Sequence, residues 1–184
     1  METRKQAYGG GQKWLHWVVA LLVFGLVPVG IAMGRLPEGP LQDSLFNLHR
    51  SFGMLVLVLV LARLALRFHR GTPANATGLT RFETAVSKAT HLALYVLLLA
   101  VPLIGWLGMS AYGGDWSVFG LFKPPGLIGK SEVVSERLFV VHMVAALFLG
   151  VLALLHVGAA FMHRFIKKDT VMARMLPSRR EPRT

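Results

Sequence analysis

The sequence contains no cysteine and few charged residues. The absence of cysteine from all 184 residues excludes disulfides, thiolate-bound iron–sulfur clusters, thiolate nucleophiles and the C-x-x-C-H attachment of a covalent haem. Only 16% of the residues are charged, against about 25% in a typical soluble domain. By contrast, 54% are hydrophobic and the mean hydropathy is +0.54. This composition predicts an integral membrane protein.

Four long apolar stretches are present, at residues 14–33, 48–68, 91–110 and 138–162. Each reaches the length of about 20 residues that a helix needs to cross a bilayer. We therefore predict an all-α, four-helix transmembrane bundle that forms a single domain over residues 1–184. The first stretch is too long and too rich in tryptophan for the apolar core of a signal peptide, so we expect it to be retained.

The formal net charge is +11, which in a soluble protein would suggest a nucleic-acid partner. Its distribution along this chain indicates membrane orientation instead, and we expect no nucleic-acid partner. Fifteen of the 20 Lys and Arg residues fall in the two tails and around the second connection; the other five are Arg35, Arg50, Lys123, Lys130 and Arg137. The positive-inside rule then predicts that both termini are cytoplasmic, with the lipid bilayer as partner of the basic tail.

The connection between the third and fourth stretches is unusually aromatic. It contains Trp116, Phe119 and Phe122 between two glycines and the Pro124-Pro125 pair. We expect it to lie on the membrane surface and to cover the outer mouth of the bundle. The alternative is an ordinary interfacial aromatic anchor.

Four of the seven histidines lie inside the predicted spans, where ionisable side chains are costly and usually functional. With the N-terminus inside, His16 and His156 fall near the cytoplasmic face, whereas His49 and His142 fall near the outer face. His142 and His156 are about 21 Å apart along one helix and nearly four turns apart, so they share a face. The topology therefore predicts two histidine pairs at two depths.

Haem fits two such pairs better than a bare metal ion does. The four stretches contain no Asp, Glu or Cys, the ligands that zinc or a di-metal centre would also use. Haem is large and apolar and accepts two neutral imidazoles as axial ligands. Small residues on the spans would admit a flat ring, or simply allow close helix packing. Proton-relay histidines and structural hydrogen bonds remain the alternatives.

Two further histidines lie near the predicted cytoplasmic ends of the spans. His163 follows His156 by seven residues, on roughly the same face and near the basic residues Arg164, Lys167 and Lys168. A quinone headgroup there could take a hydrogen bond or a proton from His163, which is our candidate catalytic residue. His91 begins the third span. Both residues have the alternative of marking only the membrane boundary.

The sequence resembles the bacterial cytochrome b561 family, the short four-helix dihaem proteins of the bacterial inner membrane. The matching motifs run in order along nearly the whole chain: W-L-H-W at 14–17, H-R-S-F-G at 49–53, A-R-L-A-L-R at 62–67, H-L-A-L-Y at 91–95, V-P-L-I-G at 101–105, W-S-V-F-G-L at 116–121, K-D-T at 168–170 and R-M-L-P at 174–177. Each motif is weak alone, but their order and spacing are specific.

The resemblance implies two haem b groups, one bound by His16 and His156 on the cytoplasmic side and one by His49 and His142 on the periplasmic side. It also implies electron transfer between the periplasmic face and ubiquinone. Some family members resemble superoxide oxidases, which pass electrons from superoxide to quinone near the position of His163. Others are electron-transfer subunits of hydrogenases or formate dehydrogenases, or serve a periplasmic partner.

Two functions therefore follow as hypotheses. The first is a superoxide:ubiquinone oxidoreductase, whose outer basic residues would steer the small superoxide anion inward; those residues have the alternative of interfacial snorkelling. The second is an electron-transfer module that relays to or from a periplasmic or dehydrogenase partner. A transmembrane scaffold without redox activity is third.

Overall fold

Four long helices account for most of the chain in the computed structural model, which describes residues 7–73 and 78–176. They are α1 (Gly10–Met33), α2 (Pro40–Arg70), α3 (Arg81–Tyr112) and α4 (Glu132–Phe161). Each has an apolar window long enough to cross a membrane, which confirms the predicted all-α fold of four apolar helices. Each helix is longer than its predicted apolar stretch because polar residues at the ends continue it by further helical turns.

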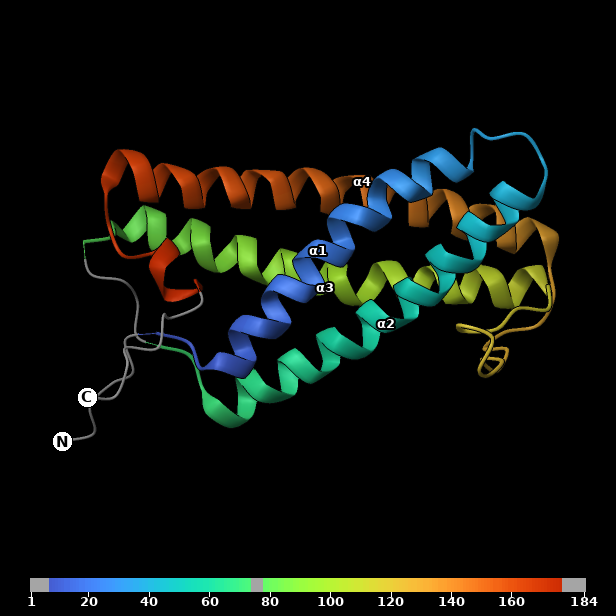
Figure 1. The fold of residues 1–184 in the computed structure, drawn as a ribbon, viewed down its shortest axis with the longest axis horizontal. Helices are drawn as coiled ribbons and strands as arrows, with labels where there is room; N and C mark the ends of the chain where they lie inside the picture. Colours follow the sequence, from blue (N-terminus) through green and yellow to red (C-terminus); the bar gives the residue numbers. More distant parts are fainter. Residues whose placement is uncertain (1–6, 74–77, 177–184) are drawn as a thin grey trace.

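The helices alternate in direction, so the connections gather at two ends of the molecule (Figure 1). The start of α1, the end of α2, the start of α3 and the end of α4 lie together; we call this the tail end. The connections 34–39 and 113–131 lie at the opposite end, which we call the loop end. α1 contacts α2 and α4, and α3 contacts α2 and α4, so the four helices close into a ring.

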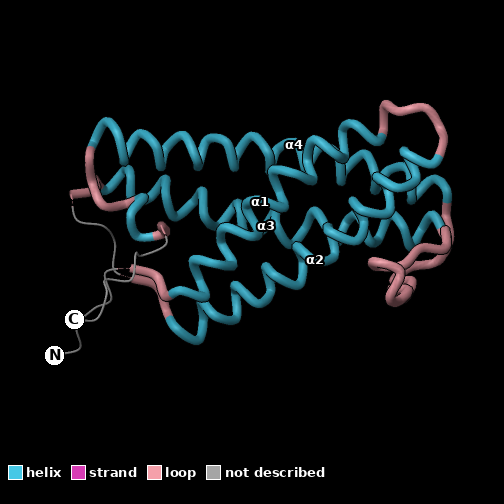
Figure 2. Tube along the Cα trace, viewed as in Figure 1, coloured by secondary structure: helices cyan, strands magenta, loops and turns pink. Residues whose placement is uncertain are grey.

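Local sequence signals define the helix ends. Thr80 caps α3, with its Oγ1 accepting the Glu83 amide and the Glu83 carboxylate accepting the Thr80 amide, a reciprocal capping box. Gly113 ends α3 in the left-handed conformation at φ 71°, which glycine adopts without steric cost. Secondary structure outside the four helices is short in the described residues, as Figure 2 shows.

The buried core is small and lies at the middle of the bundle. It consists of Val19, Val23, Val56, Val60, Leu98, Val101 and Leu149. Leu149 stands midway along α4 between His142 and His156, so apolar packing separates the two histidine levels. Large apolar side chains point outward along the helices, for example Leu21 at 74% and Leu155 at 65% exposure. Such a surface is suited to lipid rather than water.

Candidate functional site

His49 of α2 and His142 of α4 meet at the loop end. Their ring centroids are 6.0 Å apart and the ring planes are inclined by 80°. His142 Nδ1 donates to the Val101 carbonyl of α3 at 2.9 Å, which fixes the ring and leaves Nε2 free to bind a ligand. The predicted topology placed these two residues at the same depth, and in the structure their rings meet although α2 and α4 are far apart in the sequence.

Two glycines make room for this pair. A Cβ atom at Gly30 would lie 3.1 Å from His49 Cε1, and one at Gly105 would lie 3.0 Å from His142 Cε1. Both distances are shorter than ordinary van der Waals contact. The imidazoles occupy space that any larger residue at these positions would take.

His16 of α1 and His156 of α4 meet at the tail end, with ring centroids 6.4 Å apart and planes inclined by 82°. His91 of α3 is also present, with its ring centroid 5.2 Å from that of His156. Its Nδ1 donates to the Ser87 carbonyl at 2.7 Å. His91 thus contacts a residue of the predicted pair although it is exposed at the tail end, and the spacing of the histidines along the chain did not reveal this contact.

Both predicted pairs have a ring spacing that would let the two imidazoles of each pair hold one haem iron between them. A metal-to-imidazole nitrogen distance is about 2 Å, and each ring centroid lies roughly 1 Å further back, so two axial rings are about 6 Å apart. The observed spacings of 6.0 and 6.4 Å match this value. The 5.2 Å between His91 and His156 is shorter and typical of direct edge-to-face ring contact.

The polar atoms of these rings support the same interpretation. Nδ1 of His16 and of His49 is buried without a hydrogen-bond partner among the described residues, although the Leu26 backbone lies near the His49 ring. Buried polar groups normally have partners, and exceptions call for an explanation. In residues 7–73 and 78–176 no group of three or more His, Asp or Glu side chains is placed to hold a bare metal ion. Paired imidazoles among apolar side chains fit haem.

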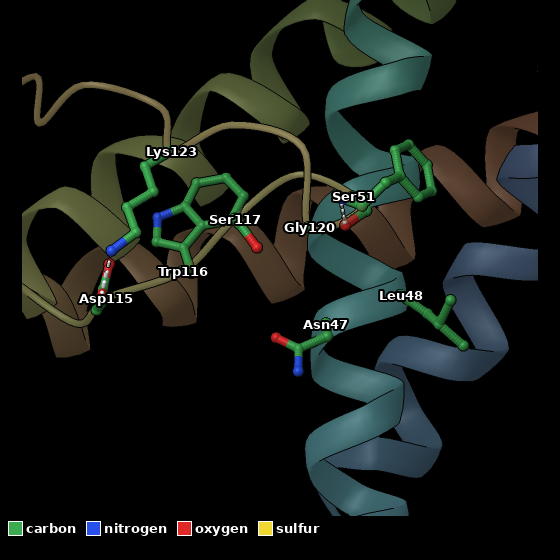
Figure 3. A pocket seen from close by; sticks show the side chains of 9 residues that line it. Asn47, Leu48, Ser51, Asp115, Trp116, Ser117, Gly120 and Lys123 are labelled. Carbon is green, nitrogen blue, oxygen red and sulfur yellow. Dashed lines mark hydrogen bonds and ion pairs between the residues drawn. The ribbon is translucent and has the colours of Figure 1, made fainter.

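The loop end carries a cavity of about 480 Å³ between α2 and the 113–131 connection, lined by Asn47, Leu48, Ser51, Asp115, Trp116, Ser117, Phe119, Gly120 and Lys123 (Figure 3). The Phe119 amide donates to Ser51 Oγ at 2.9 Å, and the Phe119 ring lies edge-on to Phe52. These contacts hold the aromatic connection against α2, beside His49.

Lys123 lines this cavity, whereas Arg50 lies beside it and contacts the lining residues Asn47 and Trp116. Lys123 forms an exposed ion pair with Asp115 at 2.7 Å, so its charge is largely neutralised. Arg50 is half-buried, donates to Asn47 Oδ1 and the Phe46 carbonyl, and lies 5.9 Å from the Trp116 ring centroid. No Asp or Glu within the described ranges pairs with Arg50. Arg50 is therefore a cation without an ion-pair partner next to the loop-end pair, although Asp43 acts on it electrostatically from a longer distance.

His163 lies at the tail end, in the π-helical turn η1 (Met162–Lys167) that follows α4. Its Nδ1 bonds the Asp169 carboxylate at 2.5 Å, and the second Asp169 oxygen accepts the Val171 amide at 2.9 Å. Burial acts to raise the pKa of Asp169, but these two bonds outweigh burial and hold its pKa below the ordinary value. The ring therefore faces an ionised carboxylate at neutral pH.

A second ion pair fixes this turn to the rest of the bundle. Lys167 bonds Glu83 at the start of α3, which joins the end of α4 to the capping box. The positive charge of Lys167 is thus already compensated, and Arg164 and Lys168 are the exposed cations beside His163. Pairing of Lys167 with a residue 84 positions away could not be read from the sequence.

Comparison with known proteins shows the family of this chain. Residues 7–178 match the family described as prokaryotic cytochrome b561. The chain is 30% identical to cytochrome b561 homolog 2 of Escherichia coli K12 over 175 residues, 93% of this chain and 92% of the relative. It is 31% identical to cytochrome b562 of Cereibacter sphaeroides over 182 residues, 96% and 99% of the two chains.

A further relative carries an activity in its name. The chain is 26% identical to the probable superoxide oxidase CybB of Yersinia pestis over 166 residues, which cover 90% of this chain and 93% of that protein.

The family match spans all four helices and both histidine levels. The chain therefore belongs to the prokaryotic cytochrome b561 family, the haem b electron-transfer cytochromes of the inner membrane.

Proposed function

We propose that the chain binds two haem b groups, one between His16 and His156 and one between His49 and His142. The observation that supports this most strongly is the presence of two imidazole pairs at two levels with nearly equal centroid spacing, 6.4 and 6.0 Å. When bound, the haems supply a one-electron path along the bundle. The protein holds the rings in place through helix packing and the bond from His142 to Val101.

The tail end is cytoplasmic in this proposal, so the loop end faces the periplasm. The support is the excess of Lys and Arg in the tails and around the second connection. Reporter fusions at the C-terminus should be active only for a cytoplasmic reporter. Activity of a periplasmic reporter there would reverse the sides of both haems.

The activity we propose is that of a superoxide:ubiquinone oxidoreductase. Two superoxide anions each give one electron and leave as dioxygen, and ubiquinone takes up two electrons and two protons to form the quinol. Arg50 lies against Trp116, which lines the loop-end cavity, and supplies positive charge that attracts the anion toward His49 and His142. The relative named a probable superoxide oxidase makes superoxide the first donor to test.

Quinone is reduced beside His163 in this proposal. The residue follows His156 by about 10 Å of helix rise, so a headgroup there lies within short electron-transfer reach of the tail-end haem. Asp169 holds the His163 ring through Nδ1, which leaves Nε2 to face a quinone oxygen and deliver a proton. The quinone tail stays in lipid.

The test uses the purified full chain with its haems, exposed to enzymatically generated superoxide and a soluble ubiquinone analogue. Quinol formation that superoxide dismutase abolishes, and that His142→Ala lacks, is the expected result. A two-haem protein that reduces no quinone under these conditions would contradict the superoxide activity. Electron relay to a protein partner, consistent with relatives that are named simply as cytochromes, would then become the leading function.

A further inference from the structure

Two arginines one helical turn apart occupy the tail end of α2. Arg63 and Arg67 both lie against the ring of Tyr95 on α3, with guanidinium carbons 5.4 and 5.6 Å from the ring centroid. Arg63 stands seven residues before the end of α2, about 10 Å along the helix axis. Both side chains are half-buried.

Neither arginine has a carboxylate partner in the part of the chain that the structure describes. The acidic groups in this region are already engaged: Glu83 bonds Lys167 and the Thr80 cap, and Asp169 bonds His163. Two like charges held on one aromatic ring repel each other, and partial burial adds a desolvation cost. The two guanidinium groups therefore have no carboxylate among the described residues to neutralise them.

The arginines face the tail-end histidines. Together with Tyr8, Gln12, His91, Tyr95 and Met175 they line a narrow cavity of about 20 Å³, room for about one small polar group. The His91 ring contacts the His156 ring at 5.2 Å, and Arg63 lies within electrostatic range of both His16 and His156. An acidic group that neutralised the two arginines would therefore lie beside the proposed tail-end haem.

We propose that Arg63 and Arg67 together bind one carboxylate of the tail-end haem, an inference that rests on the proposed function. Haem b carries two propionate side chains, and the small cavity beside the two guanidinium groups would receive the carboxylate of one of them. Arginine suits this role because its planar fork bonds a carboxylate at two points. The pair anchors the tail-end haem and raises its reduction potential, since positive charge disfavours the ferric form.

The first test measures reduction potentials in Arg63→Gln/Arg67→Gln, with the loop-end haem of the same molecule as internal reference. Without the two charges, the ferric-to-ferrous affinity ratio of the tail-end haem should rise about tenfold, which is about 59 mV of lower potential for one electron. The loop-end potential should stay unchanged. Arg70→Gln, an exposed position on the same helix, is the matched control and should leave both potentials unchanged.

The second test starts from the unsubstituted chain, whose folding no substitution can impair. The haem-free full chain is titrated with haem and with haem dimethyl ester, whose carboxylates are methylated. The tail-end site of the unmodified chain should prefer the free acid at least tenfold, whereas the loop-end site should show a smaller preference. Arg63→Lys/Arg67→Lys keeps the charge but loses the fork, and should retain the haem with an intermediate preference.

Equal binding of acid and ester at the tail-end site, or an unchanged potential in the double glutamine variant, would overturn the proposal. If both potentials stay unchanged and the double glutamine variant is instead retained less well in vesicles containing phosphatidylglycerol, the arginines bind lipid phosphate and the proposal is wrong. Failure of the proposed function is separate, because it would appear as the absence of a two-haem spectrum in the unmodified chain.

Discussion

The two histidine levels are similar in ring spacing but differ in what surrounds them. At the loop end, His49 and His142 are enclosed by backbone: Gly30 and Gly105 approach the rings, and the Val101 carbonyl bonds one of them. At the tail end, His16 and His156 are surrounded by side chains that carry charge or polarity. These are His91, Arg63, Arg67 and, further along, the His163–Asp169 pair.

This contrast suggests a division of labour between shape and charge. A site formed by glycines and a carbonyl fixes the position of a ring and adds little charge beyond that of Arg50. A site with two arginines adjusts potential, and a neighbouring histidine–carboxylate pair can supply protons. In the proposed reaction the superoxide donor gives only an electron, whereas quinone takes up electrons and protons, so groups that can supply protons are needed at the tail end.

The largest expected effect tests the pairing itself. His49→Ala or His142→Ala should remove the loop-end haem completely and leave one haem per chain, and His16→Ala or His156→Ala should remove the tail-end haem. The cause is loss of an axial ligand. Reduced-minus-oxidised spectra with a haem-to-protein ratio measure it.

His91→Ala sharpens the same prediction, because His91 is the competing ring at the tail end. It should retain two haems, since the 5.2 Å contact is too short for a metal between the rings. Two low-spin haems in His16→Ala together with loss of one in His91→Ala would assign the ligand to His91 instead.

The next largest effect concerns quinone. His163→Ala should keep both haems and their spectra but slow quinone reduction at least tenfold, about 1.4 kcal/mol in the activation barrier. Asp169→Asn keeps a hydrogen-bond acceptor without the charge and should have a smaller effect. Steady-state quinol formation at fixed superoxide flux measures both. An unchanged rate in His163→Ala would mean that the residue only marks the membrane boundary.

The fold and the two pairs were accessible from the sequence for simple reasons. Helices that cross a bilayer must be long and apolar, and the alternation of direction sets the depth of each residue. His16 and His156 therefore had to lie at one level and His49 and His142 at the other. The depth of a residue in the membrane depends only on its position along the chain and on the direction of its helix.

The surroundings of the pairs were not accessible in this way. The contacts of His91 with His156, of Lys167 with Glu83 and of Arg63 and Arg67 with Tyr95 depend on how each helix is rotated. Rotation follows from packing between helices, and apolar residues cover the helices on all sides here, so no amphipathic pattern indicates it. Small residues on the spans are visible in the sequence, but only their positions opposite the rings distinguish Gly30 and Gly105 from ordinary packing residues.

A smaller effect should arise from the glycine at the loop end. In Gly105→Ala the new Cβ would lie 3.0 Å from the His142 ring, and such overpacking costs about 1 kcal/mol. The loop-end haem should then bind about fivefold more weakly. Gly25→Ala, where a Cβ meets no atom within 4 Å, is the matched control. Haem-transfer kinetics compare the two variants, and equal loss of the loop-end haem from both would contradict a role for Gly105 in shaping the site.

The smallest effect we expect is at the loop-end mouth, where charge guides the donor without binding haem. Arg50→Gln should slow the second-order reaction with superoxide about threefold, because the electrostatic steering by one charge without an ion-pair partner is lost. Its rate should also depend less on ionic strength. Lys123→Gln should change the rate less, since Asp115 already neutralises that lysine. Arg81→Gln removes the same charge at the tail end and controls for net charge. If Arg81→Gln slows the reaction as much as Arg50→Gln, overall charge rather than the position of Arg50 attracts the anion, and the loop end is no more specialised for superoxide than any other cationic surface.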